Sequence, residues 1–253
     1  MIVEQNNMIL EETGLGYKRR MGIEQDDFAY VMEVLRGSMY SNKPLAIIRE
    51  YTTNAWDAHI EAGIDRPIQI TCPSYITPVL RIRDFGNGLS QEDVFNYFGN
   101  YGKSSKRHTN EQTGMMGLGS KVAFCDFEEW NIVSIYNGVK TNYLFFIDNS
   151  NIGEITIVGE EKTNEESGIE IVINVRRDDI HRYNETIVTF CREFEPRPII
   201  VGNSDISNRV NDNNLEIILK GSNWQIRKGR GNDLIKRSEE HTSELQSRFG
   251  ISY

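Results

Sequence analysis

The sequence at residues 49–58 is Arg49-Glu50-Tyr51-Thr52-Thr53-Asn54-Ala55-Trp56-Asp57-Ala58. Glu50, Asn54 and Asp57 recur at intervals of four and three residues, which places all three on one face of a helix predicted over residues 44–62. On a half-buried helix such a row costs stability unless each polar group has a partner. A magnesium ion and a polarised water would provide partners. Taken alone, however, the row also fits a helix face in contact with solvent.

The elements around this helix indicate the fold class. Ser41 is predicted to cap the helix and Gly63 to end it. Hydrophobic periodicity predicts further helices over 26–36, 90–98 and 178–194, and alternating residues predict strands over 68–72, 79–83, 128–136, 142–147, 154–159 and 169–175. This order predicts an α+β fold, a two-layer sandwich with helices on one face of a mixed, mostly antiparallel sheet.

A second motif follows the second predicted strand directly. It reads Asp84-Phe85-Gly86-Asn87-Gly88. A carboxylate at a strand end, with two glycines behind it, suits a ligand held against the backbone, because glycine permits positive φ and close approach. By itself the motif is equally typical of a tight turn with a solvent-facing aspartate.

A third motif ends the longest glycine-rich segment, residues 99–120. It reads Gly114-Met115-Met116-Gly117-Leu118-Gly119-Ser120-Lys121. Backbone amides before a helix start predicted at Ser120 suit phosphate oxygens, and Lys103-Ser104-Ser105-Lys106 upstream adds charge and hydroxyl groups. The residue order excludes a Walker A loop, and the preceding long loop excludes a Rossmann fingerprint. A flexible loop without a ligand is the alternative.

The three motifs, in this order, resemble the pattern of the GHKL (Bergerat-fold) ATPases over about residues 25–200. Type II topoisomerases, MutL proteins, ninety-kilodalton heat-shock chaperones and histidine kinases share this domain. Within the superfamily the chain most resembles the phage rapid-lysis protein A (rIIA-like) family. The stretches that carry this resemblance are Arg49-Glu50 through His59, Arg83 through Gly86, Ser104 through Lys106, Gly117 through Lys121, and Ser167 through Val172.

The resemblance implies a role for each matching residue. Glu50 would be the general base that activates water, Asn54 the Mg²⁺ ligand and Asp57 a support of the nucleotide pocket. Asp84 would accept a hydrogen bond from the adenine amino group. The residues that would shape this pocket or wrap the phosphates as a lid are Gly86, Gly88, Lys103, Ser104, Ser105, Gly114, Gly117, Leu118, Gly119, Ser120 and Lys121.

The chain departs from the family pattern at Gly168-Ile169, where many members have a threonine after the glycine that helps to hold adenine. Either Ser167 or a water would substitute, or adenine would be held less tightly. Asp84 is present, so ATP remains the expected ligand.

The resemblance implies an ATP-hydrolysing, Mg²⁺-dependent enzyme with lid closure over ATP and a nucleotide-dependent homodimer. Two alternatives stay open. One is a nucleotide-binding regulatory module without hydrolysis, against which Glu50 argues. The other is the N-terminal ATPase fragment of a chaperone, MutL-like or topoisomerase-like protein.

Charge and cysteine content exclude other classes. A formal net charge of -9 argues against a dedicated nucleic-acid binder. Cys72, Cys125 and Cys191 are far apart, which argues against a disulfide scaffold or a zinc site. With neither a signal peptide nor a membrane span visible, the sequence predicts a cytoplasmic protein. The rIIA-like resemblance implies the cytoplasm of the host cell, with peripheral membrane association.

The predicted domains are an N-terminal arm over 1–22, the ATP-binding domain over 23–198, the start of a truncated second β-rich domain over 199–236, and a non-native tail over 237–253. The tail resembles a translated sequencing adapter and is excluded from the fold prediction. The sequence also predicts that Trp56 packs in the core and that the histidines, His59 among them, lie at the surface.

Overall fold

The computed structural model describes residues 40–99, 119–212, 217–220, 224–228 and 234–238. Predictions for the N-terminal arm, for the helix over 26–36 and for most of the glycine-rich loop lie outside these ranges. Among the described residues, no helix is both long enough and apolar enough to span a bilayer.

The main sheet has seven strands in the order β5-β4-β3-β6-β2-β1-β7. Their bounds are β1 Gln69–Thr71, β2 Val79–Arg83, β3 Glu129–Tyr136, β4 Val139–Ile147, β5 Gly153–Lys162, β6 Gly168–Asn174 and β7 Ile199–Val201. All neighbours pair in antiparallel fashion except β1 and β7, which are parallel.

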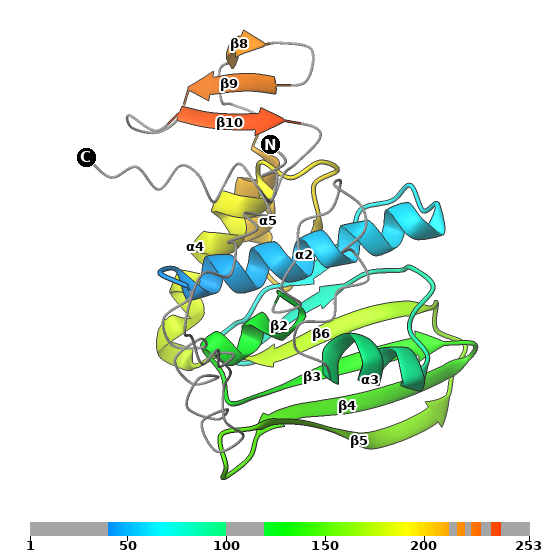
Figure 1. The fold of residues 1–253 in the computed structure, drawn as a ribbon. Coiled ribbons are helices and arrows are strands. Elements are labelled where there is room, and N and C mark those ends of the chain that lie inside the picture. The colour runs from blue at the N-terminus through cyan, green and yellow to red at the C-terminus, as the bar shows by residue number, and fades with distance from the viewer. Residues whose placement is uncertain (1–39, 100–118, 213–216, 221–223, 229–233, 239–253) are drawn as a thin grey trace, which may run out of the picture.

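The helices gather on one face of this sheet (Figure 1). They are α2 (Lys43–Ala62), α3 (Gln91–Gly99), α4 (Ile180–Cys191) and α5 (Ser204–Asn211), with the 3₁₀ helices η2 (Gly119–Cys125) and η3 (Arg177–Asp179). The predicted α+β sandwich with a mostly antiparallel sheet is therefore confirmed.

Helix α2 has the predicted end but not the predicted cap. Asn42, not Ser41, caps the first turn, because its Oδ1 accepts the Leu45 N–H at 3.3 Å. Gly63 ends the helix in the left-handed region, at φ 67°, and donates its N–H to the Ile60 carbonyl.

The core between helices and sheet is centred on Trp130 of β3, which is fully buried. Its ring stacks on Phe145 of β4 at 4.3 Å. Tyr51 of α2, Phe98 of α3 and Phe124 of η2 approach the same ring, with centroids 5.5, 6.2 and 5.9 Å away. Burial of these aromatic side chains fixes three helical segments on one strand residue.

The C-terminal part corrects one predicted boundary. Ile199–Val201 does not open a second domain: it is β7, and Ile200 lies opposite Ile70 in parallel pairing with β1. A separate three-stranded sheet follows, made of β8 (Ile217–Lys220), β9 (Trp224–Lys228) and β10 (Leu234–Ser238). Strand β10 includes the first two residues of the segment interpreted as an adapter.

His59, in the last turn of α2, is fully buried, so its predicted surface position is wrong. Its Nδ1 lies 3.0 Å from the Arg66 carbonyl, and its Nε2 accepts the Phe85 N–H at 2.8 Å. Only the neutral ring with a proton on Nδ1 makes both bonds. His59 thereby joins α2 to the turn after β2, and its burial lowers its pKa.

We predict that the stability contributed by His59 is lost on acidification. The folded-state pKa lies below the ordinary value of 6.5, so the contribution is complete above that pH. The stability contributed by His59 declines below pH 6.5, because His59 binds a proton more readily in the unfolded chain than in the folded chain. Urea unfolding at a series of pH values should show wild type losing stability relative to His59→Gln, whose amide oxygen can accept the Phe85 N–H without titrating. The exposed His181→Gln serves as control, and parallel curves for wild type and His59→Gln would contradict the assignment.

Candidate functional site

The three polar residues of α2 lie at the border of the core. Glu50, Asn54 and Asp57 are partly exposed, whereas the intervening Tyr51 and Ala55 are buried. Because α2 is continuous from residue 43 to 62, the predicted common face is present. The row is therefore a polar border of a buried helix.

The end of the glycine-rich segment lies directly against this border. A Cβ atom at Gly119 would collide with the Glu50 carboxylate in its present position, so the backbone of Gly119 lies in direct contact with that carboxylate. The structure thus brings together the helix motif and the final part of the third motif, which are almost seventy residues apart in the chain.

Tyr51, whose role no sequence motif indicated, holds these two segments together. Its hydroxyl donates to the Ser120 carbonyl and accepts the Ala123 N–H, both at 3.2 Å. The segment that begins at Gly119 is the 3₁₀ helix η2, where a helix start was predicted at Ser120. A tyrosine beside Glu50, on the buried side of the helix, was the available signal.

Ser120 and Lys121 are both buried. The Lys121 ammonium donates to the Tyr97 carbonyl of α3 at 3.3 Å and to Ser120 Oγ at 3.0 Å, and burial lowers its pKa to about 8. In this arrangement the ammonium ties η2 to the last turn of α3. The other predicted lid residues, Lys103, Ser104, Ser105, Gly114, Gly117 and Leu118, lie outside the described residues.

Asp84 follows the last residue of β2 and is 4% exposed. Its Oδ1 accepts the N–H groups of Gly86 at 2.8 Å and of Ile169 at 3.1 Å, and Oδ2 also lies 3.1 Å from the latter nitrogen. Burial raises its pKa to about 6, although these N–H groups and the nearby Arg83 lower it. These N–H groups orient the carboxylate and favour its charged form, which accepts hydrogen bonds.

Two glycines let the Asp84 turn fit between α2 and the sheet. A Cβ at Gly86 would lie 3.0 Å from the Ala58 carbonyl of α2, and one at Gly88, where φ is +71°, would collide with the Ile135 carbonyl of β3. Substitution at either position therefore requires the turn to move away from α2 or β3. The turn that begins with Asp84 thus lies against the C-terminal half of α2, whereas Gly119 lies against Glu50 in its N-terminal half.

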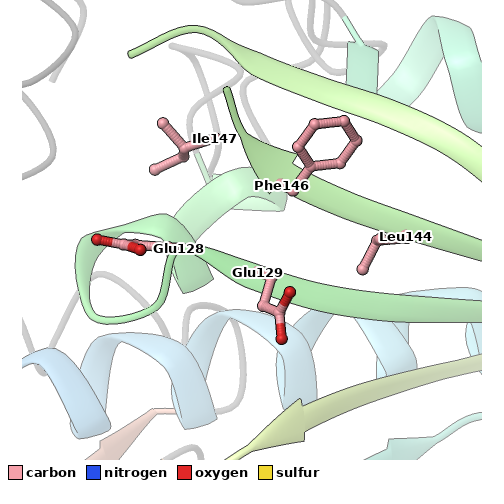
Figure 2. Close-up of a pocket in the computed structure, with 5 residues that line it drawn as sticks. All are labelled: Glu128, Glu129, Leu144, Phe146 and Ile147. Carbon is pink, nitrogen blue, oxygen red and sulfur yellow. The ribbon is translucent and has the colours of Figure 1, made fainter. Parts of the chain in front are cut away.

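A separate pocket of about 330 Å³ lies elsewhere, at one end of β3 and β4 (Figure 2). Leu144 and Phe146 line it, and they alternate with Tyr143 and Phe145, which point into the core. The pocket therefore opens on the sheet face away from the helices, and it contains none of the predicted site residues.

The donor set limits how a metal could be held. Within the described ranges, no group of three His, Cys, Asp or Glu side chains is arranged to bind a metal ion by itself. Mg²⁺ commonly binds proteins through one or two side chains and takes its other ligands from phosphates and water. The amide oxygen of Asn54, partly exposed beside Glu50, fits that mode.

Comparison with known families agrees with this geometry. The family model described as histidine kinase-, DNA gyrase B-, and HSP90-like ATPase matches residues 42–180. No curated protein matches the chain. The matched range begins at the cap of α2, includes the Asp84 turn and the end of the glycine-rich segment, and stops at the first residue of α4. The chain therefore belongs to the histidine kinase-, DNA gyrase B- and HSP90-like ATPases.

Proposed function

We propose that the chain binds ATP with Mg²⁺ between α2 and the Gly119 segment and hydrolyses it. The observation that carries the proposal is the contact between Gly119 and the Glu50 carboxylate. It brings a carboxylate that can act as a base next to a glycine segment whose amides suit phosphate oxygens.

In this proposal Glu50 takes a proton from the water that attacks the terminal phosphate. Asn54 holds Mg²⁺ together with the nucleotide phosphates, and the ion neutralises charge on them. Asp57 supports the pocket from the next turn of α2. Lys121 would contact phosphate only after leaving the Tyr97 carbonyl, and its place beside Gly119 keeps it within the same segment.

Asp84 is the proposed acceptor for the adenine amino group. The support is its burial and its fixed orientation on two backbone N–H groups. Ile169 stands where many family members have threonine, and here its backbone N–H, not a side-chain hydroxyl, contacts the carboxylate. Recognition of the base would then depend mainly on Asp84.

The sequence motifs alone support the proposals on protein family, location, lid closure and dimer formation. The rIIA-like resemblance favours a phage protein of the host cytoplasm, peripherally associated with the membrane. Closure of the residues before Gly119 over ATP, coupled to a homodimer, would make the nucleotide a switch. A regulatory module that binds without hydrolysing is the second candidate.

Glu50→Gln should abolish turnover while preserving binding, because glutamine keeps the fit against Gly119 but cannot accept the proton. We expect phosphate release to fall by about 10²–10⁴-fold, with affinity for a non-hydrolysable ATP analogue changed only a few-fold. Glu61→Gln, an exposed position of the same helix, should behave as wild type. Unchanged turnover in Glu50→Gln would remove the base assignment, and analogue binding by wild type without phosphate release would favour the regulatory module.

Asp84→Asn should reduce base selectivity, because the adenine amino group loses its charged acceptor. We expect affinity for the ATP analogue to fall about tenfold or more, whereas a GTP analogue should lose less. Calorimetric titration of both analogues measures the difference, with the exposed Asp65→Asn as control. Equal losses for both analogues would place Asp84 outside base recognition.

A further inference from the structure

Arg83, the last residue of β2, is an arginine buried immediately before Asp84. It is 9% exposed, and removal from water lowers its pKa. Arg81, two residues earlier on the same face of the strand, differs: its side chain is 41% exposed and pairs with Glu170 at 2.8 Å. Of these two arginines, Arg83 is the buried one, and burial of a cation needs an explanation.

Backbone carbonyls satisfy only part of the Arg83 guanidinium. Nη2 donates to the carbonyl of Glu166 at 2.6 Å and to that of Ser167 at 3.3 Å. Nη1 is buried and has no hydrogen-bond partner among the described residues. The guanidinium carbon lies 5.1 Å from the centre of the Phe85 ring. Hydrogen bonds to the protein therefore do not by themselves explain why the Arg83 guanidinium is buried at this position.

Nη1 and the Asp84 carboxylate instead converge on Gly168. The position that a Cβ atom would take at Gly168 is 2.6 Å from Nη1 and 2.8 Å from Asp84 Oδ1. Gly168 has φ +133°, which favours glycine, and it contributes no side chain between the two groups. The Asp84 carbonyl oxygen lies closer still to the same position, so Nη1 and the Asp84 carboxylate approach Gly168 together, with no side chain of residue 168 beside them.

The other charges near Asp84 do not replace this one. Helix α2 contributes the neutral His59, which is bound to the Phe85 N–H. The β5–β6 connection contributes Glu165, paired with Lys140, and Glu166, paired with Arg66; Glu170 of β6 pairs with Arg81. Arg83 is the side chain whose charge favours ionised Asp84.

We propose that Arg83 is a positioning residue that keeps the buried Asp84 ionised, so that this carboxylate can accept a hydrogen bond from a nucleobase amino group. The proposal rests on the proposed function of Asp84. It explains why a cation is buried at a strand end with one nitrogen unpaired.

The first test needs no nucleotide. In the full chain, the Asp84 carboxyl carbon is assigned by comparison with Asp84→Asn and titrated by ¹³C NMR. Arg83→Met should raise its midpoint, which is about 6 in wild type, by about one pH unit or more. Arg83→Lys should raise it less, and the matched control Arg81→Met should not move it. An unchanged midpoint in Arg83→Met would overturn the proposal.

Arg83→Gln provides a second variant should Arg83→Met not fold, because its amide can still donate to a carbonyl but carries no charge. The same upward movement of the Asp84 midpoint is expected, and an unmoved midpoint would overturn the proposal equally.

The second test follows binding of a non-hydrolysable ATP analogue against pH. With an Asp84 midpoint raised by about one unit, Arg83→Met should bind the analogue about fivefold more weakly than wild type near pH 6. Near pH 8.5 the two affinities should agree within about twofold, since Asp84 is then ionised in both proteins. A loss that is the same at every pH would indicate a merely structural arginine and overturn the proposal. If wild type binds no analogue, the proposed function fails, while the NMR titration still decides the role of Arg83.

Discussion

The hydroxyl of Tyr51 is the contact on which the arrangement of the site depends. It is buried between α2 and η2. In the segment that follows Gly119 it donates a hydrogen bond to the Ser120 carbonyl and accepts one from the Ala123 N–H. Because its ring also packs on Trp130, the same residue joins that segment to the sheet. With Tyr51 beside it, Gly119 lies directly against Glu50, and a side chain at position 119 would require the Glu50 carboxylate to move. Packing of an aromatic side chain thus determines where a polar site can form.

A second contact fixes the other end of the same helix. His59 accepts the Phe85 N–H, so the turn that begins with Asp84 cannot move independently of α2. Gly86 allows the turn to lie against Ala58, and Gly88 allows it to lie against β3. Contacts at both ends of α2 thus set the separation between the Glu50 carboxylate and the Asp84 carboxylate.

The sequence predicted the parts of this arrangement that depend on local periodicity. The extent of α2, its end at Gly63 and the order of strands follow from hydrophobic spacing and from glycine conformation. It did not predict the buried His59 or the bridging Tyr51, because these depend on which segments meet in space. It also placed the cap of α2 at Ser41, one residue before Asn42, because both residue types can cap a helix. For the same reason Ile199–Val201 resembled the opening of a new domain: its partner β1 is about 130 residues earlier. His59, Tyr51 and Ile199–Val201 all make contacts between elements.

Asp84 and His59 have opposite proton preferences although one turn connects them. Burial favours the neutral form of each, so acid removes the stability that neutral His59 contributes, whereas protonation of Asp84, whose pKa is raised, adds stability as the pH falls through about 6. The two effects offset each other in the folded chain. The folded chain would be more stable with Asp84 protonated, since burial of a neutral carboxyl costs less free energy than burial of a carboxylate. Placing a buried, incompletely paired arginine beside that carboxylate works against this preference, and such a conflict is expected where a charge serves binding more than folding.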